Sequence, residues 1–597
     1  MYYSQRIFNF VIDTDFFICD TSLLILHFIL LDCMRRSRQT PVKWVVVVVG
    51  FSIIFFLLGL KLGSVFQSVP VHPISRLSDV TVTKATTTQI PIQTQRSLDS
   101  DLRVEKTGNS SVCAIEQTQR YVEYFRFSQE GKHLQEEHGQ LRIAAFSRLW
   151  VPPLHGTGGM QYHALHLYSQ LASRGHEVHV FVTGPPDVSR QKTLRFRVNS
   201  KTLELEELPA GSVKAMLTVH QVASDKNGEY SVGWYENCLT KFGEVNRTVG
   251  GFHVSHSESW AAVPNLFQLG LQMVVTWHGS MLDWFRNEVN LIVHNFRMKS
   301  KMTGAHTAKR MNDLGSSVAY EAYMLLAVPH HVVISDSAAD NLADINLIDE
   351  AKIHLIYNGV NPSSFQPATN KNDARRVFIQ EHAHGLEMSP DTFLVGCGGR
   401  LESIKGHHQL SEAMKLVLKT HPNIVLLVSG DGGERYRYDH LKQTYPSQVF
   451  LLGMLKQNVL AKFYQVLDVF VDPFYQHHGL NTVMLEAVLT GIPIIVTKLA
   501  SSQTTAPCTE FGRTFRLGDT KELANQILHY HQNPQERIEV GKSVRERALH
   551  LFSSSIMAGS YETLFYKVYL NPMPLPKLTG KVVCRHTYPA MCYREPV

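Results

Sequence analysis

The sequence predicts an α/β protein with two lobes, in each of which helices flank a parallel sheet. From residue 141 onward, short apolar runs alternate with segments of helical periodicity and with glycine-rich turns. This alternation is typical of parallel strands that are joined by crossover helices. The chain has 597 residues, more than one hydrophobic core normally accommodates, so we expect two large domains with additional segments.

The composition supports a large folded protein and argues against other classes. Hydrophobic residues make up 44% of the chain and charged residues 18%, which is typical of a packed core rather than of global disorder. Lys and Arg number 58 against 52 Asp and Glu, without a dense basic block, so nucleic-acid binding is not indicated. The 30 histidines are scattered and lack the ligand spacing of a zinc site.

Residues 44–62 predict a transmembrane signal-anchor. From Trp44 the chain reads WVVVVVGFSIIFFLLGL without a charge, and about 17 residues is the short end of what a bilayer requires. The cations that precede this run are Arg35, Arg36, Arg38 and Lys43. By the positive-inside rule, they place residues 1–43 in the cytosol and the body of the protein in a lumen. A cleaved signal peptide is the alternative.

The segments on either side of the anchor lead to further expectations. Met34 is our hypothesis for the natural start of the chain, and residues 63–140 read as a polar lumenal stem. A short anchor favours the thinner early secretory membranes, so we expect a single-pass type II protein of the Golgi apparatus or endoplasmic reticulum. In that setting Asn109 and Asn246, each in a sequon, are candidate glycosylation sites of a glycoprotein. Cys584 and Cys592 could close a short loop, but the sequence leaves disulfide pairing open.

The first lobe, over residues 141–365, contains a candidate anion site. A strand predicted over residues 141–147 leads into a loop with Gly158 and Gly159, after which helical spacing begins. Glycines allow close backbone approach, and the helix N-terminus offers free N–H groups to a phosphate or carboxylate. A nicotinamide-dinucleotide fold is the alternative, although Gln161 stands where its third glycine belongs.

His278 follows the strand predicted over residues 272–276 in the same lobe. The ends of strands in doubly wound sheets deliver ligand-binding residues, so His278 is a candidate for chemistry. A purely structural hydrogen-bonding histidine is the alternative for this position.

The second lobe, over residues 366–545, begins with a candidate diphosphate clamp. The strand predicted over residues 393–398 leads into Gly399 and Arg400, and Lys405 follows closely. An arginine can bind phosphate oxygens in a bidentate manner, and a lysine acts as a point charge. Solvated surface cations are the alternative.

A helix predicted over residues 482–490 supplies the next candidates. Asn481 is a fitting N-cap, Thr482 begins the helix, and its N-terminus can hold an anion. Glu486 lies about one turn inside, where a carboxylate can accept hydrogen bonds from ribose hydroxyls. A glutamate that merely complements the helix dipole is the alternative.

Taken in order, these motifs resemble the retaining glycosyltransferases of family 4, or glycosyl transferases group 1. The resemblance covers residues 141–569 and implies the GT-B fold, in which two Rossmann-like domains face each other across a cleft. It rests on the Gly158-Gly159 loop with Gly175-His176, Thr276-Trp277-His278-Gly279, Asn358-Gly359-Val360, Gly399-Arg400-Leu401 with Lys405-Gly406, Gly430-Asp431-Gly432, and Leu485-Glu486-Ala487 with Gly491-Ile492-Pro493.

The resemblance implies transfer of a hexosyl group from a nucleoside-diphosphate sugar to a glycan or other hydroxyl acceptor, with retention of configuration. It implies that Gly158, Gly159, Arg400, Lys405 and the helix end at Asn481 and Thr482 contact the donor diphosphate. It also implies that Glu486 binds the ribose, that His278 lies near the transferred sugar, and that His478 and Gly479 lie near the donor. His478 stands where the family has a glutamate, which puts donor preference or activity in question.

Further expectations concern metals, the C-terminus and competing functions. The resemblance implies no metal or other cofactor, because such enzymes use side-chain cations where the other major glycosyltransferase fold uses an Asp-x-Asp site and a divalent ion. The Asp-x-Asp matches at residues 13–15 and 99–101 lie outside the predicted globular body. Residues 546–570 are expected to cross back to the first domain as one helix, followed by a tail over residues 571–597. The alternatives are a catalytically inactive GT-B domain that binds nucleotide or glycan, and a cytosol-facing lipid-linked sugar transferase of inverted topology.

Overall fold

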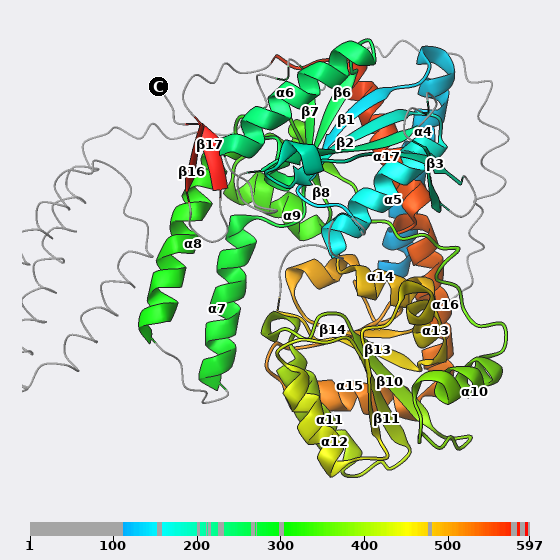
Figure 1. Ribbon diagram of the computed structural model, residues 1–597. Coiled ribbons are helices and arrows are strands. Elements are labelled where there is room, and N and C mark those ends of the chain that lie inside the picture. The colour runs from blue at the N-terminus through cyan, green and yellow to red at the C-terminus, as the bar shows by residue number, and fades with distance from the viewer. Residues whose placement is uncertain are drawn as a thin grey trace, which may run out of the picture. The chain divides into compact units, whose positions relative to one another are not determined.

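The computed structural model shows two α/β lobes and the helices that join them (Figure 1). It describes residues 112–151, 154, 158–199, 203–209, 212, 216–224, 232–263, 269, 271–297, 304–475, 480–574, 582–585 and 591–594. The predicted N-terminal segment, the anchor at residues 44–62 and the stem up to residue 111 lie outside this description. Within it, no helix has both the length and the apolar character needed to cross a membrane.

The first lobe is built on a nine-stranded sheet in the order β4-β3-β5-β2-β1-β6-β7-β8-β9. β3 is antiparallel to both of its neighbours, and the other pairs are parallel. The strands are β1 (Arg142–Phe146), β2 (Glu177–Gly184), β3 (Thr193–Val198), β4 (Leu205–Glu207), β5 (Leu217–Ala223), β6 (Val254–Glu258), β7 (Met273–Trp277), β8 (His330–Val333) and β9 (Ile353–Leu355). The strand order reverses at β1, between β2 and β6, and such a switch point opens a ligand crevice at the carboxyl ends of the strands.

Helices cover both faces of this sheet because its central strands are apolar on both sides. Ile143 and Ala145 of β1 pack with α5 (Gly159–Ser173) and α17 (Ser554–Leu570), while Ala144 and Phe146 pack on the other face. The helices on that other face are α6 (Val232–Thr248), α7 (Met281–Arg297), α8 (Gly304–Leu325) and the short α9 (Asp336–Asp340).

The second lobe is an all-parallel six-stranded sheet in the order β12-β11-β10-β13-β14-β15. Its strands are β10 (Phe393–Gly398), β11 (Ile424–Ser429), β12 (Val449–Gly453), β13 (Val469–Asp472), β14 (Ile494–Thr497) and β15 (Arg513–Phe515). The strand predicted over residues 393–398 is confirmed at both ends. Here the order reverses at β10, between β11 and β13, so the turn after β10 is the switch point of this lobe.

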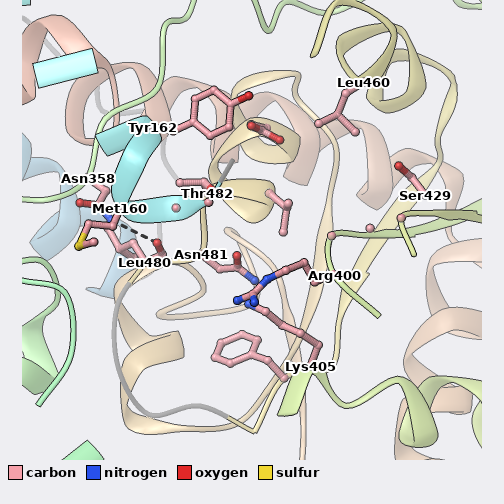
Figure 2. Close-up of a pocket in the computed structure, with 18 of the residues that line it drawn as sticks. Met160, Tyr162, Asn358, Arg400, Lys405, Ser429, Leu460, Leu480, Asn481 and Thr482 are labelled. Atoms are coloured by element: carbon pink, nitrogen blue, oxygen red, sulfur yellow. Dashed lines mark hydrogen bonds between the residues drawn. The ribbon is translucent and has the colours of Figure 1, made fainter. Parts of the chain in front are cut away.

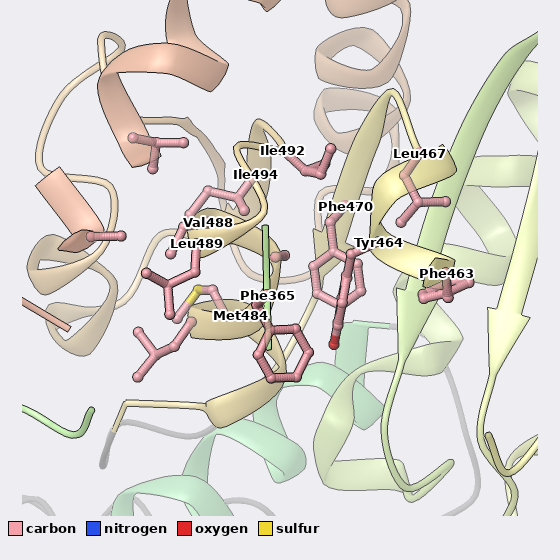
Figure 3. Close-up of a cluster of buried hydrophobic side chains, with 14 of the residues drawn as sticks. Phe365, Phe463, Tyr464, Leu467, Phe470, Met484, Val488, Leu489, Ile492 and Ile494 are labelled. Atoms are coloured by element: carbon pink, nitrogen blue, oxygen red, sulfur yellow. The ribbon is translucent and has the colours of Figure 1, made fainter. Parts of the chain in front are cut away.

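Two layers of helices sandwich the second sheet. On one face lie α11 (His407–Leu418), α12 (Arg435–Thr444) and α15 (Thr520–Gln532); on the other lie α10 (Lys371–His382), α13 (Gln457–Val466), α14 (Thr482–Leu489) and α16 (Pro534–Leu551). Figure 3 shows the second of these interfaces, where Phe470 of β13 lies beside Tyr464 of α13 and near Met484 of α14. This packing fixes the start of α14, which borders the cavity described below.

The helix α4 (Val112–His138) corrects the predicted stem. Residues 112–138 belong to the folded body and pack along α17. The sequence of α4 has no apolar stripe, so its hydrophobic periodicity did not predict a helix. Contact with α17 stabilises this helix instead. A Cβ atom on Gly559 would lie 2.2 Å from Ser128 O, and one on Gly131 would lie 2.7 Å from Glu562 Cγ. The two helices therefore touch through glycine on both sides.

The predicted crossover helix is two helices rather than one. α16 ends at Leu551 in the second lobe, and α17 begins at Ser554 against the first lobe, with Ser553 as its N-cap. The Ser553 side chain accepts a hydrogen bond from Ile556 N, which explains why a new helix begins there. A disulfide between Cys113 and Cys508 joins α4 to the loop before β15. In the tail, Cys584 of β16 (Val582–Arg585) stands opposite Cys592 of β17 (Met591–Arg594) in an antiparallel pair.

Candidate active site

A cavity of about 440 Å³ lies where the carboxyl ends of the two sheets meet. Its volume falls in the range typical of small-molecule sites. From the first lobe it is lined by Gly158, Gly159, Met160, Tyr162, His278 and Asn358, and from the second by Arg400, Lys405, Ser429, Asn481, Thr482 and Glu486. Figure 2 shows Met160, Tyr162 and Asn358 of the first lobe on one side of this space and Arg400, Lys405 and Asn481 of the second on the other.

The N-terminus of α5 forms one wall of the cavity. Gly158 occupies the N-cap position in an extended conformation, and no side chain of the described residues caps this helix. A Cβ atom on Gly159 would meet no atom of the described structure within 4 Å, so the backbone faces open space there. The first N–H groups of α5 are therefore available to an anion in the cavity.

The turn after β10 carries two cations into the cavity. Arg400 forms an ion pair with Glu402 at 2.8 Å and is largely exposed, and both cations extend toward Asn481 in Figure 2. Burial lowers the pKa of Lys405, while nearby Asp472 acts in the opposite direction. Gly406 holds this turn close to β13, since it has a φ of 73° and a Cβ atom there would lie 1.7 Å from Pro473 O.

The start of α14 is open to the cavity because Asn481 does not cap it. Asn481 occupies the predicted N-cap position, but its side-chain nitrogen donates to Asp472 Oδ2 at 2.6 Å. Asp472 is buried at the end of β13, where burial raises its pKa and Lys405 and the Asn481 bond lower it. Asn481 therefore takes the predicted N-cap position without capping the helix through its side chain, and the first N–H groups of α14 stay available to an anion.

Glu486 is held inside the cavity wall by a tyrosine. It is buried in α14, and its Oε2 accepts a hydrogen bond from Tyr464 Oη at 2.9 Å. Burial raises the pKa of Glu486 to about 8, against a smaller effect of the Tyr464 bond. Tyr162 of the first lobe also lines the cavity, and Glu486 contributes to raising the pKa of its hydroxyl.

His278 belongs to a buried polar cluster in the first lobe. Its Nε2 donates to Glu258 Oε2 at 2.5 Å, and the other carboxylate oxygen of Glu258 accepts from Tyr168 Oη at 2.8 Å. His163 of α5 lies beside both, with its ring 4.6 Å from that of His278. One nitrogen from each histidine and a Glu258 oxygen lie within 4.8 Å of one another, so these three residues could hold a metal ion.

The structure brings most of the predicted site residues together. Gly158, Gly159, His278, Arg400, Lys405, Asn481, Thr482 and Glu486 all line the cavity. His478 and Gly479 lie outside the described residues, as does the sequon at Asn109. Asn246 lies in α6, where its side-chain oxygen accepts a hydrogen bond from Phe252 N at 2.7 Å.

Other residues of the site were missed in the sequence. Tyr464 and Tyr162 lie within helices and carry no local signal. Glu258 and Asp472 are the last residues of β6 and β13, so their places at strand ends could have revealed them. The cluster of His163, Glu258 and His278 has no metal-like spacing, because its members come from three separate elements.

Two glycosyltransferase family models match the chain, one in each lobe. The model described as Glycosyltransferase Family 4 matches residues 157–364, and the model described as Glycosyl transferases group 1 matches residues 392–533. Both matches span the turns that line the cavity.

The matches to individual curated relatives cover part of each relative's length. The capsular polysaccharide biosynthesis glycosyltransferase CapM of Staphylococcus aureus is 28% identical over 39% of this chain and 60% of CapM. The UDP-Gal:alpha-D-GlcNAc-diphosphoundecaprenol alpha-1,3-galactosyltransferase of Escherichia coli is 26% identical over 38% of this chain and 56% of that enzyme. The chain thus spans less than two thirds of these curated relatives. Sucrose-phosphate synthase from Thermosynechococcus elongatus shares the fold, with a TM-score of 0.55 and 20% identity over 72% of this chain and 100% of that chain.

These comparisons correct the predicted location, a single-pass type II protein of the Golgi or endoplasmic reticulum membrane. That prediction is wrong, because the two curated relatives described above are bacterial glycosyltransferases. It depended on bilayer thickness and on residues 35–62, which cannot identify a compartment. What the comparisons show is narrower: the first lobe matches the Glycosyltransferase Family 4 model, the second matches the Glycosyl transferases group 1 model, and the two together have the GT-B fold.

Proposed function

We propose that this protein transfers a sugar from a nucleoside-diphosphate sugar to an acceptor hydroxyl with retention of configuration and without a metal. The observation that carries the proposal is the convergence of two helix N-termini and two cations on one cavity. The N-termini of α5 and α14 and the side chains of Arg400 and Lys405 all border it. Such an arrangement matches a diphosphate, which carries its charge on several oxygens.

The cations stabilise the charge that develops when the bond to the diphosphate breaks. Lys405 is buried enough that its pKa is lowered, so its charge acts through a medium of low polarity. Arg400 reaches the same point and exchanges Glu402 for the diphosphate when the donor binds. The helix N-termini supply fixed N–H donors that need no reorganisation. The leaving diphosphate accepts the acceptor proton, so no separate protein base is assigned.

Glu486 and His278 orient the donor on either side of the diphosphate. A carboxyl oxygen of Glu486 accepts a hydrogen bond from the ribose, and Tyr464 holds the carboxyl group in place. His278 lies against the transferred sugar and is held by Glu258. The relative from Escherichia coli is named for its use of UDP-Gal, which supports a nucleotide-sugar donor.

An inactive binding domain is the less favoured reading. It rested on His478, whereas the clamp of Arg400 and Lys405 and the carboxylate of Glu486 are in place around the cavity.

A thermal-shift screen of the purified chain against UDP, GDP and ADP sugars tests the proposal. A ligand that binds the folded state raises the melting temperature, so we expect one nucleotide class to do so preferentially. Sugar transfer or donor hydrolysis should then follow with that class, and should persist in EDTA. The proposal is refuted if no nucleotide sugar shifts the melting temperature or is turned over.

A further inference from the structure

We propose that His163, Glu258 and His278 form a binding site for a divalent transition-metal ion of the zinc class, and that the bound ion inhibits sugar transfer. The binding site stands on the geometry of the first lobe alone. The inhibition rests on the proposed function, because it depends on the role of His278 at the donor sugar.

The three residues converge from separate elements in a place shielded from solvent. His163 lies in α5, Glu258 ends β6 and His278 follows β7. The side chains of His163 and Glu258 are 1% and 0% exposed, and that of His278 is 14% exposed. His278 also lines the cavity, so an ion can enter from there and keep one coordination position open toward it.

Hydrogen bonds fix which nitrogen of His163 carries the proton. The side-chain nitrogen of Asn358 donates to Leu480 O at 3.3 Å, so its oxygen faces His163 Nδ1, at 2.8 Å. That oxygen can only accept, so His163 Nδ1 is the donor. With the proton on Nδ1, the lone pair of the His163 imidazole lies on Nε2.

This lone pair points at a carboxylate. His163 Nε2 lies 3.7 Å from Glu258 Oε1 and has no hydrogen-bond partner among the described residues. Both oxygens of Glu258 accept hydrogen bonds, one from Tyr168 and the other from His278, so this side chain faces His163 as an acceptor. Two acceptors that face each other in a buried site repel, and a cation between them removes this repulsion.

The ligand chemistry selects the ion. Two imidazoles and one carboxylate with an open fourth position form a set that binds zinc, whereas magnesium and calcium prefer cages of oxygen ligands. His163 Nε2 and one Glu258 oxygen are already separated by about the distance between two ligands of one tetrahedral zinc. His278 Nε2 binds the ion in the tautomer that carries its proton on Nδ1, so the proton moves from Nε2 to Nδ1 through solvent and the hydrogen bond to Glu258 breaks. No oxidation or reduction takes place.

Zinc binding would alter the part of the cavity that His278 lines. In the proposed function the His278 ring contacts the transferred sugar, and a ring fixed to zinc cannot adjust to it. We therefore expect zinc to lower the transfer rate, although transfer itself needs no metal.

The first experiment measures zinc binding to the full chain by competition with a chromophoric chelator. The His163→Leu variant keeps the bond between His278 and Glu258 but removes one ligand, and Glu258→Gln removes the charge with little change of shape. We expect the wild type to bind one zinc ion more than either variant, or at least about tenfold more tightly. His166→Leu, one turn further along α5 and outside the cluster, should bind like the wild type.

The outcomes of these experiments test the zinc site and the proposed function independently. Equal zinc binding by the wild type and by folded samples of both variants overturns the site, whether or not the protein transfers sugar. If the site binds zinc, transfer by the wild type should fall with added zinc while transfer by His163→Leu falls less. Equal inhibition of the two, or none in the wild type, overturns the inhibitory half. Failure of every donor in the absence of zinc concerns the proposed function and leaves the binding result to decide the site.

Discussion

The two lobes bring opposite chemistry to the same cavity. The second lobe contributes cations and helix N–H groups from turns that directly follow its strands, at Arg400, Lys405 and Thr482. The first lobe contributes, besides the start of α5, a buried carboxylate surrounded by imidazoles, at Glu258, His163 and His278. The second lobe is thus suited to bind an anion, and the first to hold polar groups in fixed orientations. The predictions below test whether this division holds, from the largest expected effect to the smallest.

Lys405→Ala should cause the largest loss of activity. The substitution removes a half-buried charge from the point where the leaving group gains charge, and loss of one such group typically costs about 10²- to 10³-fold in rate. The measurement is the rate of sugar transfer at saturating donor, with circular dichroism to verify the fold. Lys415→Ala is the matched control, since Lys415 pairs with Glu412 on the exposed face of α11. Equal rates for Lys405→Ala and the wild type would remove the second lobe's assigned role.

Glu486→Gln should change how stability depends on pH. The folded pKa of Glu486 is about 8 against about 4.3 in an unfolded chain, so between these values the unfolded state binds fewer protons than the folded state. The contribution of this group is fully present below about pH 4 and is lost as the pH rises toward 8, by up to about 1.4 kcal/mol per unit.

Urea unfolding of the ligand-free protein at pH 5 and pH 7.5 measures this effect. The glutamine variant should gain stability relative to the wild type by about 3 kcal/mol between the two pH values. Glu412→Gln, on the surface, should show no such trend. A constant difference between Glu486→Gln and the wild type would mean that Glu486 is ionised in the folded protein.

Cys113→Ser should destabilise the protein by about 2–4 kcal/mol, the typical value of a native disulfide. The bond joins α4, which packs along α17 of the first lobe, to the second lobe at Cys508. Thermal melts with and without dithiothreitol measure the effect. Reductant should lower the melting temperature of the wild type and leave that of the variant unchanged. An equal response of both proteins would mean that another bond is the sensitive one.

The sequence predicted more of the site residues in the second lobe than in the first, for a physical reason. β10 and β11 are buried on both sides and therefore read as unbroken apolar runs, and Arg400 and Lys405 closely follow the first of them. In the first lobe the partners of His278 lie 20 and 115 residues away, so only the folded chain unites them. α4 was missed for the same reason, since its stability comes from contact with α17.

Gly406→Ala tests how far the positions of Arg400 and Lys405 depend on the turn that carries them. We expect the smallest effect from this substitution. Gly406 combines a φ of 73° with a Cβ position 1.7 Å from Pro473 O, so alanine both strains the backbone and displaces β13 from the turn. Gly385 has a φ of 84°, but no atom of the described residues lies within 4 Å of its Cβ position, so Gly385→Ala measures the backbone strain alone.

We expect Gly385→Ala to cost about 1 kcal/mol in unfolding free energy and Gly406→Ala to cost about 1–3 kcal/mol. Gly406→Ala should also weaken donor binding, because the turn that it changes carries Lys405 into the cavity, whereas Gly385 does not line the cavity. Equal costs for the two variants would mean that the contact with Pro473 relaxes freely. In that case the position of Lys405 would depend on the donor more than on the second lobe, and the contrast between the lobes would be weaker than their geometry suggests.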